Sequence, residues 1–231
     1  MRFWLAAAIA VLLPPLAAAQ PPERPVVGEL FTSEGCSSCP PADAKLAELV
    51  RTRPDLLLLS FHVTYWNYLG WRDPYSFEAA TQRQQRYVAL AVSPEVYTPA
   101  LVVDGKFDVV GSDKPAVDRT LRQAALSEET AAPIEVQRST AGLTVSVGAG
   151  SGAGTLLLVG YDRLHQTAVG RGENGGRTLT EANIVRSMSV LGVWSGKPVR
   201  LQVPNPAGQE VAVLLQRNDG RIVGAGIPRP A

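Results

Sequence analysis

The sequence has no large excess of positive or negative charge, and it contains few histidines and cysteines. Lysine and arginine number 22 against 21 aspartate and glutamate residues, which gives a formal net charge of +1. Since there is no basic excess to neutralise phosphates, we do not expect nucleic acid as a partner. There are only two histidines and two cysteines, and Walker, HExxH and GxSxG motifs are missing. The sequence therefore lacks the usual signatures of nucleotide-binding proteins, zinc proteases and serine hydrolases.

Long apolar runs are also missing after the first 19 residues. The N-terminus combines a positive residue, Arg2, with an apolar run over Trp4–Leu13 and small residues at 17–19. This is the pattern of a signal peptide, and the run is short for a membrane span, which needs about 20 residues. An uncleaved N-terminal anchor is the alternative. We expect a periplasmic or secreted protein without a stable membrane span after cleavage, in a compartment where disulfides persist.

The remaining chain has the composition of a folded protein, with 45% hydrophobic and 19% charged residues. Residues 20–130 mix helical and extended patterns, whereas residues 131–231 read as short strands separated by Gly, Pro and Asn turns. Several of these strands alternate polar and apolar residues, as half-exposed antiparallel strands do. We predict an α/β domain over 20–130, followed by a small all-β, sandwich-like domain over 131–231.

Both cysteines lie in one motif, Cys36-Ser37-Ser38-Cys39, between an apolar run and a helical pattern. Two thiols at this spacing form a redox pair, a static disulfide or half of a soft-metal site. A four-residue ring removes little unfolded-state entropy, which favours the redox reading. At the start of a helix, unpaired N–H groups and the helix dipole stabilise a thiolate. We predict that Cys36 is the nucleophilic sulfur that attacks a client disulfide, or the sulfur that a client thiolate attacks, and that Cys39 resolves the mixed disulfide.

The elements around the motif are predicted from local patterns. Leucines in Leu56–Val63 indicate a strand buried on both faces, Asp73-Pro74 reads as the start of a helix, and Asp104-Gly105 indicates a hairpin. Further helical patterns cover 42–51 and 114–128. The predicted order is β–α–β–α–β–β–α, a central mixed sheet flanked by helices, with the cysteines at the first strand-to-helix junction.

This order, with Cys36–Cys39 after the first strand and Thr98-Pro99 before the hairpin, resembles the thioredoxin superfamily. The resemblance implies a cis Pro99 facing the redox cysteines and a client that contacts Thr98. The segments GELFTSEGCSSCPPAD, SFHVTYWNYLGWRDP, YTPALVVDG and RGENGGRTLTEANIVR together resemble, more narrowly, a family of secreted bacterial thioredoxin-like proteins described as a domain of unknown function.

Three further features leave alternatives open. His62 ends the predicted central strand, where it either completes a Cu(I) or Zn site with the two cysteines or is a buried strand histidine. The aromatic segment with Trp66 and Trp71 either grips an extended client or caps the sheet. Residues 171–177, with Asn-Gly at their centre, are first interpreted as a hairpin turn, and the alternative is contact with the redox site or with a client.

The leading hypothesis is an exported thiol–disulfide oxidoreductase that acts through Cys36, Cys39 and Pro99, without a cofactor. Its partners would be a client protein or a small thiol or disulfide, together with a redox partner that returns Cys36 and Cys39 to their starting state. The alternatives are a Cu(I) or Zn carrier that uses Cys36, Cys39 and His62, and a non-catalytic binding module with a static disulfide.

Overall fold

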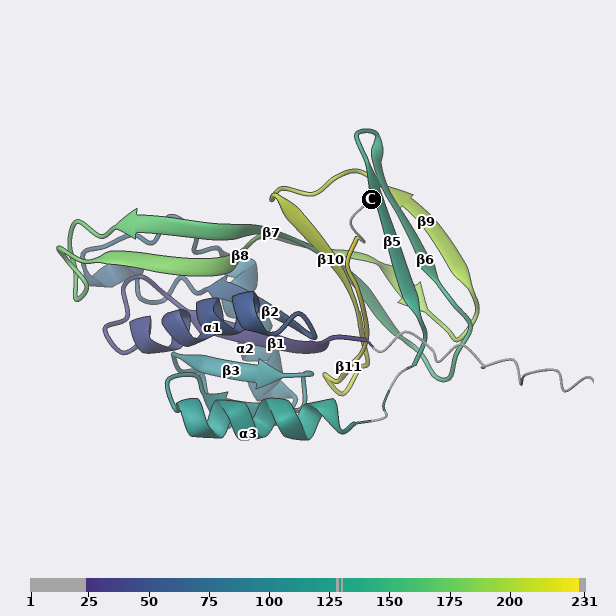
Figure 1. The fold of residues 1–231 in the computed structure, drawn as a ribbon, viewed down its shortest axis with the longest axis horizontal. Helices are drawn as coiled ribbons and strands as arrows, with labels where there is room; N and C mark the ends of the chain where they lie inside the picture. The colour runs from purple at the N-terminus through teal and green to yellow at the C-terminus, as the bar shows by residue number, and fades with distance from the viewer. Residues whose placement is uncertain (1–23, 128, 130, 229–231) are drawn as a thin grey trace, which may run out of the picture.

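The computed structural model describes residues 24–127, 129 and 131–228 (Figure 1). The predicted signal peptide, residues 1–19, lies outside this part of the chain. The first half follows the predicted order of strands and helices: β1 (Val26–Thr32), α1 (Pro40–Thr52), β2 (Leu56–His62), α2 (Glu78–Ala89), β3 (Ala100–Val103), β4 (Phe107–Val110) and α3 (Lys114–Ala125), with a short 3-10 helix, η1 (Asn67–Leu69), before α2.

The second half consists of strands: β5 (Ile134–Ser139), β6 (Gly142–Val147), β7 (Gly154–Ala168), β8 (Thr178–Trp194), β9 (Val199–Val203), β10 (Glu210–Gln216) and β11 (Ile222–Gly226). Four of these strands do not form a separate sheet. The central sheet has eight strands in the order β11-β10-β7-β8-β2-β1-β3-β4, and β5-β6-β9 form a second, antiparallel sheet. Strands from both sides of the predicted boundary at residue 130 therefore belong to one large mixed sheet.

The two halves share a buried apolar core, but the strand pairing that joins them is narrow. β8 runs parallel to β2 and pairs with it only at Ser60↔Ile184, where the Ser60 hydroxyl also donates to the Ala182 carbonyl at 2.9 Å. A buried ion pair joins Glu29 of β1 to Arg83 of α2. Arg83 also donates to Gln216 of β10 in the second half. The two halves thus share polar contacts as well as a sheet.

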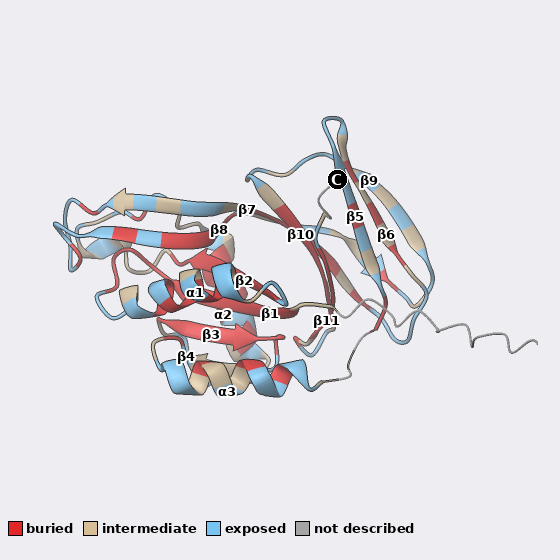
Figure 2. Ribbon diagram, viewed as in Figure 1, coloured by how far each residue is buried: buried red, intermediate tan, exposed pale blue. Residues whose placement is uncertain are grey.

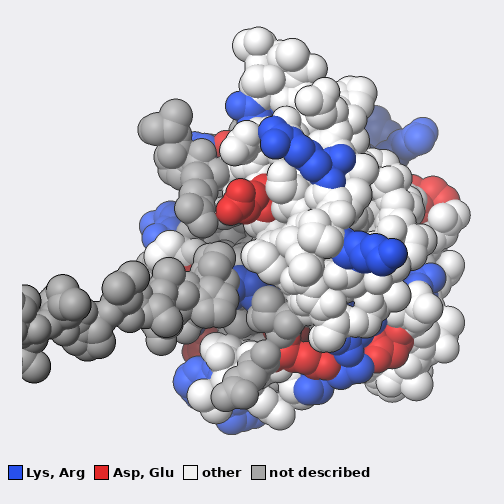
Figure 3. Space-filling model, turned by 90° about the vertical axis from the view of Figure 1, so that its right-hand side faces the viewer, with Lys and Arg blue, Asp and Glu red and all other residues white. Residues whose placement is uncertain are grey.

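The predicted sandwich-like packing corresponds to the small sheet, which lies against part of the central sheet. Buried apolar side chains of β5 and β6 pack against those of β7, β10 and β11, around the buried Trp194. Figure 3 shows the end of the molecule formed by this sheet, where lysine and arginine side chains are scattered and form no single patch. Within the described residues, no helix is long and apolar enough to cross a membrane.

Local signals explain most of the element boundaries. The leucine-rich strand β2 is buried along its whole length, and Pro40 and Pro41 stand in the first turn of α1, where a missing N–H costs nothing. Asp104 and Gly105 have φ of 50° and 60°, which confirms the predicted hairpin between β3 and β4. The Thr98–Pro99 bond before β3 is cis, as the resemblance implies.

One predicted helix start is wrong. Asp73-Pro74 was expected to cap the second helix, but α2 begins at Glu78, and Phe77 is its N-cap residue. The Asp73 carboxylate instead accepts hydrogen bonds from the backbone of Glu34 and Tyr75 and contacts His62. A charge-assisted contact in a buried site is stronger than an exposed cap, and it holds the 64–77 loop against β1 and β2.

Candidate functional site

The two cysteines form a disulfide at the N-terminal end of α1. Cys39 is the N-cap residue of the helix, and its carbonyl accepts from the backbone N–H groups of Ala42 and Asp43. The hydroxyl of Ser38 lies 3.3 Å from the sulfur of Cys36, close enough to donate to a thiolate there. Both cysteines are 0% exposed, whereas the two serines between them are exposed.

The cysteine loop, residues 33–39, is contacted by the loop between β7 and β8, residues 169–177, which we call the cover loop. Its Asn174 side chain donates to the carbonyls of Glu34 and Cys36, at 2.9 Å each. The neighbouring Glu173 carboxylate accepts from the Ser37 backbone N–H at 3.1 Å. The structure therefore shows the predicted hairpin turn at this segment, and the same turn contacts the loop that carries the cysteines.

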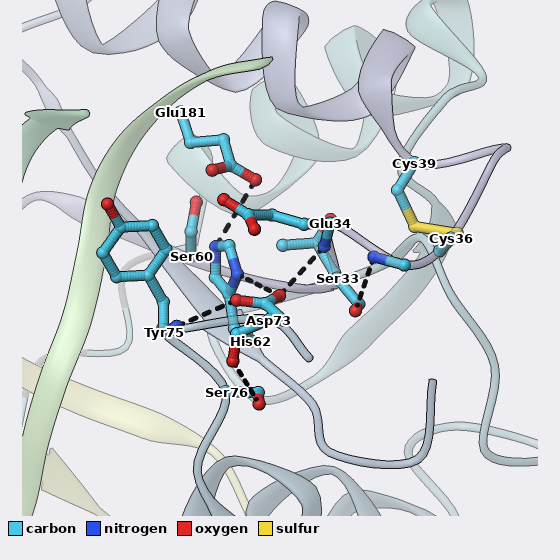
Figure 4. A network of polar contacts seen from close by, with 12 residues as sticks. Ser33, Glu34, Cys36, Cys39, Ser60, His62, Asp73, Tyr75, Ser76 and Glu181 are labelled. Carbon is cyan, nitrogen blue, oxygen red and sulfur yellow. Dashed lines mark hydrogen bonds and ion pairs between the residues drawn. A yellow bond between two sulfur atoms is a disulfide. The ribbon is translucent and has the colours of Figure 1, made fainter. Parts of the chain in front are cut away.

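Behind the cysteine loop lies a buried group of ionisable side chains, shown in part in Figure 4. His62 stands at its centre, with Nδ1 2.7 Å from Asp73 and Nε2 3.7 Å from Glu181. Asp73 also accepts from the Glu34 backbone, two residues before Cys36, and Asp43 accepts from the hydroxyl of Thr32 at 2.8 Å. We call His62, Glu34, Asp43, Asp73 and Glu181 the acidic cluster; each is at most 3% exposed.

Burial and mutual charge shift the pKa values of the acidic cluster strongly. Burial lowers the pKa of His62, but the negative charges of Asp73 and Glu181 outweigh it and raise this pKa to about 10. Burial raises the pKa of Glu181 to about 9 and that of Asp43 to about 7, against the opposing charge of His62. The pKa of Glu34 is also raised by burial.

Asp73 differs from the other acids because it is the direct partner of His62. Burial raises its pKa, but the charge of His62 and their hydrogen bond bring this pKa below its ordinary value. At neutral pH the acidic cluster therefore contains a His62–Asp73 ion pair and a protonated Glu181, while Asp43 is close to half-protonated. A carboxyl with a pKa near 7 is suited to accept and release a proton.

The chain is similar to a family of proteins and to a solved structure. The family model described as "Protein of unknown function (DUF1223)" matches residues 26–216. The chain belongs to this family. The X-ray crystal structure of a protein from Agrobacterium tumefaciens is similar to it, with 30% sequence identity and a TM-score of 0.77 over 91% of this chain and 96% of that one. Among curated proteins, no similar one was found.

In this DUF1223 chain, the predicted client-binding residues contact one another or the acidic cluster. The indole N–H of Trp66 donates to the Thr98 hydroxyl at 2.7 Å, next to the buried Pro99. The indole N–H of Trp71 donates to the Glu34 carboxylate, also at 2.7 Å. Trp71 thus positions an acid of the cluster, and Trp66 ties the aromatic loop to the cis-proline segment.

The alternative metal site of Cys36, Cys39 and His62 is not assembled in this DUF1223 chain. The ring nitrogens of His62 face Asp73 and Glu181, not the sulfurs, because the buried carboxyls attract the imidazolium. Over the described part of the chain, no group of three or more His, Cys, Asp or Glu side chains is arranged to hold a metal ion.

A groove of about 520 Å³ runs beside the site, between α1 and the β7–β8 hairpin. Asp43 contributes to its lining, so the groove passes one carboxyl of the acidic cluster. Apolar side chains line much of the rest, from both elements: Pro40, Ala44, Ala47, Leu164 and Leu179.

Sequence reasoning missed most of the acidic cluster in the DUF1223 chain. It singled out His62, interpreted Asp73 only as a helix cap, and gave no role to Asp43 or Glu181. One signal was available for Glu181: in β8 it follows Leu179 by two residues and shares the buried face of the alternation. An acid on the apolar face of a strand indicates a buried carboxyl with a partner. For Asp43 and Asp73 the surrounding sequence carries no comparable signal.

Proposed function

We propose that the chain is an exported thioredoxin-like protein that exchanges disulfides through Cys36 and Cys39. The observation that carries this proposal is the position of the Cys36–Cys39 disulfide. It lies immediately before α1, with Cys39 as the N-cap residue one helical turn before Asp43, a buried carboxyl with a pKa of about 7. A reactive disulfide needs a group nearby that trades protons at neutral pH, and a static one has no use for it.

The thioredoxin-like assignment is supported by the first half of the chain. In the segment β2-β1-β3-β4 of the central sheet, β1 is parallel to β2 and antiparallel to β3, which is antiparallel to β4. The cysteines follow β1, and the cis Thr98–Pro99 bond precedes β3. Four further strands, β8, β7, β10 and β11, extend this arrangement beyond β2.

The proposed step is a two-stage exchange with a client dithiol. A client thiolate attacks the sulfur of Cys36, the Cys36–Cys39 bond breaks, and Cys39 leaves as a thiolate. The second client thiolate then attacks the client sulfur of the mixed disulfide and releases Cys36. Two electrons and two protons leave the client, which ends with a disulfide, and the protein ends with two thiols. A partner disulfide reverses the change in Cys36 and Cys39.

The acidic cluster gives this step a proton acceptor and donor. Asp43 lies four residues after Cys39, on the same face of α1, and its Oδ2 atom has no hydrogen-bond partner. Near pH 7 it takes up a proton when a thiol ionises and returns it when a thiolate is released. The His62–Asp73 pair holds the Glu34 backbone in place next to the cysteine loop.

Thiol trapping of the folded protein tests this function. Mature protein is equilibrated for a day in glutathione buffers of increasing reducing strength, and free thiols are alkylated and counted by mass. We expect a single transition between no alkyl groups and two, and Asp43→Asn should leave its midpoint within the range of these buffers while slowing the approach to equilibrium. If the disulfide is reduced only when denaturant unfolds the chain, Cys36–Cys39 is a static bridge and the proposal fails.

A further inference from the structure

The cover loop closes a site that a disulfide exchange protein must open. Asn174 is 0% exposed although it stands at the tip of a hairpin, and it fills its donor capacity with two backbone carbonyls of the cysteine loop. Its own carbonyl accepts from Arg177 at 2.9 Å. Both cysteines are 0% exposed in the arrangement that contains these contacts, so a client thiolate can reach Cys36 only after a rearrangement.

The cover loop is internally rigid, so it is suited to move as a unit. Its backbone is closed by hydrogen bonds from Val169 to Arg177, Gly175 to Gly172, Gly176 to Val169 and Arg177 to Asn174. Gly172 has a φ of 74° and lies so close to Trp71 that an added Cβ would be 3.1 Å from the Trp71 Cβ. The cover loop therefore packs closely against the loop that contains Trp71, without strand pairing between the two loops.

The stem of the hairpin has a natural point of bending. β10 pairs with β7 only as far as Tyr161, and β8 meets β2 only at Ile184, so the strands beyond these residues form a two-stranded ribbon. At this point the β7–β8 register shifts between Gly160 and Tyr161, and Asn183 has a φ of 50°. Figure 2 shows the β7 side of this ribbon as largely exposed, whereas Leu179 and Glu181–Asn183 on the β8 side are buried. Such ribbons are weakly stable alone, and bulges bend them.

We propose that the cover loop occupies a binding site for an extended client backbone and lifts away when the client enters. This rests on the thiol–disulfide function proposed above. With the loop lifted, the cysteine loop presents one N–H, on Ser37, and two carbonyls, on Glu34 and Cys36. These groups match the alternating donors and acceptors of an extended polypeptide, which would replace the hydrogen bonds made by Glu173 and Asn174.

The first test measures how fast dithiothreitol reduces the oxidised mature protein under native conditions. Asn174→Ala removes two hydrogen bonds that hold the cover loop closed, and we expect reduction about 10- to 100-fold faster than in the wild type. Glu173→Ala, an exposed change that spares the fold, should accelerate it about 3- to 10-fold. Asn205→Ala is the matched control, since this amide also donates to a backbone carbonyl, Ser139, but on the small sheet.

The second test asks whether the opened site recognises a backbone. An unstructured ten-residue peptide with one central cysteine is compared with the same peptide carrying N-methyl groups on the amides beside that cysteine. Each rate of attack on the oxidised protein is divided by the rate of the same peptide with a small aromatic disulfide. We expect the unmethylated peptide to react at least about 5-fold faster, because only its amides can donate to the Glu34 and Cys36 carbonyls.

The outcomes separate this inference from the function on which it rests. Equal reduction rates in wild type, Asn174→Ala and Glu173→Ala would overturn the proposal that the loop covers the disulfide. Equal normalised rates of the two peptides would overturn the binding site for a client backbone. Neither result contradicts disulfide exchange. A disulfide that resists dithiothreitol in every variant until the chain unfolds overturns the proposed function, and the cover with it.

Discussion

The carboxyl of Glu181 should make this protein less stable as the pH rises. Burial raises its pKa from 4.5 to about 9, so the native chain holds a proton that the unfolded chain releases above about pH 5. The free energy of unfolding then falls as the pH increases, by about 1 kcal/mol per pH unit for one such proton. Between pH 5 and pH 8 Glu181 alone removes about 3 kcal/mol.

His62 acts in the same direction. Its pKa is raised to about 10, so its contribution is complete below about pH 6.5 and is lost as the pH rises through 10. Asp73 acts in the opposite direction, because its pKa is lowered, but its contribution is already complete above pH 5. We therefore expect the highest stability at mildly acidic pH, with a continuous decline toward pH 9.

The variant Glu181→Gln isolates this effect, since glutamine has the shape of the protonated side chain and cannot release a proton. Urea denaturation of the oxidised wild type and variant at each pH from 5 to 9 gives the slope of stability against pH. We expect Glu181→Gln to match the wild type near pH 5 and to flatten the slope by about 1 kcal/mol per pH unit. Glu135→Gln, a change at an exposed position of β5, serves as the control.

Two results would refute this reasoning. One is a wild-type stability that stays constant or rises between pH 5.5 and pH 8. The other is a Glu181→Gln variant with the same pH slope as the wild type, which would mean that the Glu181 carboxyl is already ionised in the folded chain.

Three further changes test the fold. Arg83→Met leaves Glu29 buried without its ion-pair partner and should lower the free energy of unfolding by about 3–5 kcal/mol, with recovery in a variant where both residues are methionine; urea denaturation measures both. Gly105→Ala would place a Cβ 1.9 Å from the Gly220 carbonyl at a φ of 60°, and should lower stability by at least about 2 kcal/mol in the same assay. Replacing both cysteines by serine removes the disulfide and should lower the free energy of unfolding by only about 2 kcal/mol, because the ring that the disulfide closes is short. A loss twice as large would assign the disulfide a structural role.

The sequence predicted those parts of the fold whose signals are local. The leucines of β2, the prolines that begin α1 and the Asp104-Gly105 hairpin each depend on neighbours within a few residues. The strand-rich character of the second half was predicted for the same reason. Their place in the architecture was not predicted, because pairing β8 with β2 depends on which sheet edge lies open after the first half folds, and alternation of side chains carries no such information.

The acidic cluster could not be predicted for a related reason. Its members come from the loop after β1, from α1, β2 and the loop before α2, and from β8; apart from Glu181, each acid resembles a surface residue in its own segment. At Asp73 the local helix-cap signal was misleading, because it competes with a buried partner, His62, that no local pattern reveals. Only the disulfide and His62 carried chemistry that could be recognised from residue type and spacing.

The single pairing between β2 and β8 has a consequence for how the molecule folds. Ser60 and its partner Ala182 are 122 residues apart in the chain, so the central sheet is completed by a very long-range contact. Such contacts form slowly, because a large loop must close before they contribute. We expect β1 to α3 to become ordered first during refolding, with β2 at an open edge. His62 then meets Glu181, and the cover loop reaches the cysteines, only when the last strands dock.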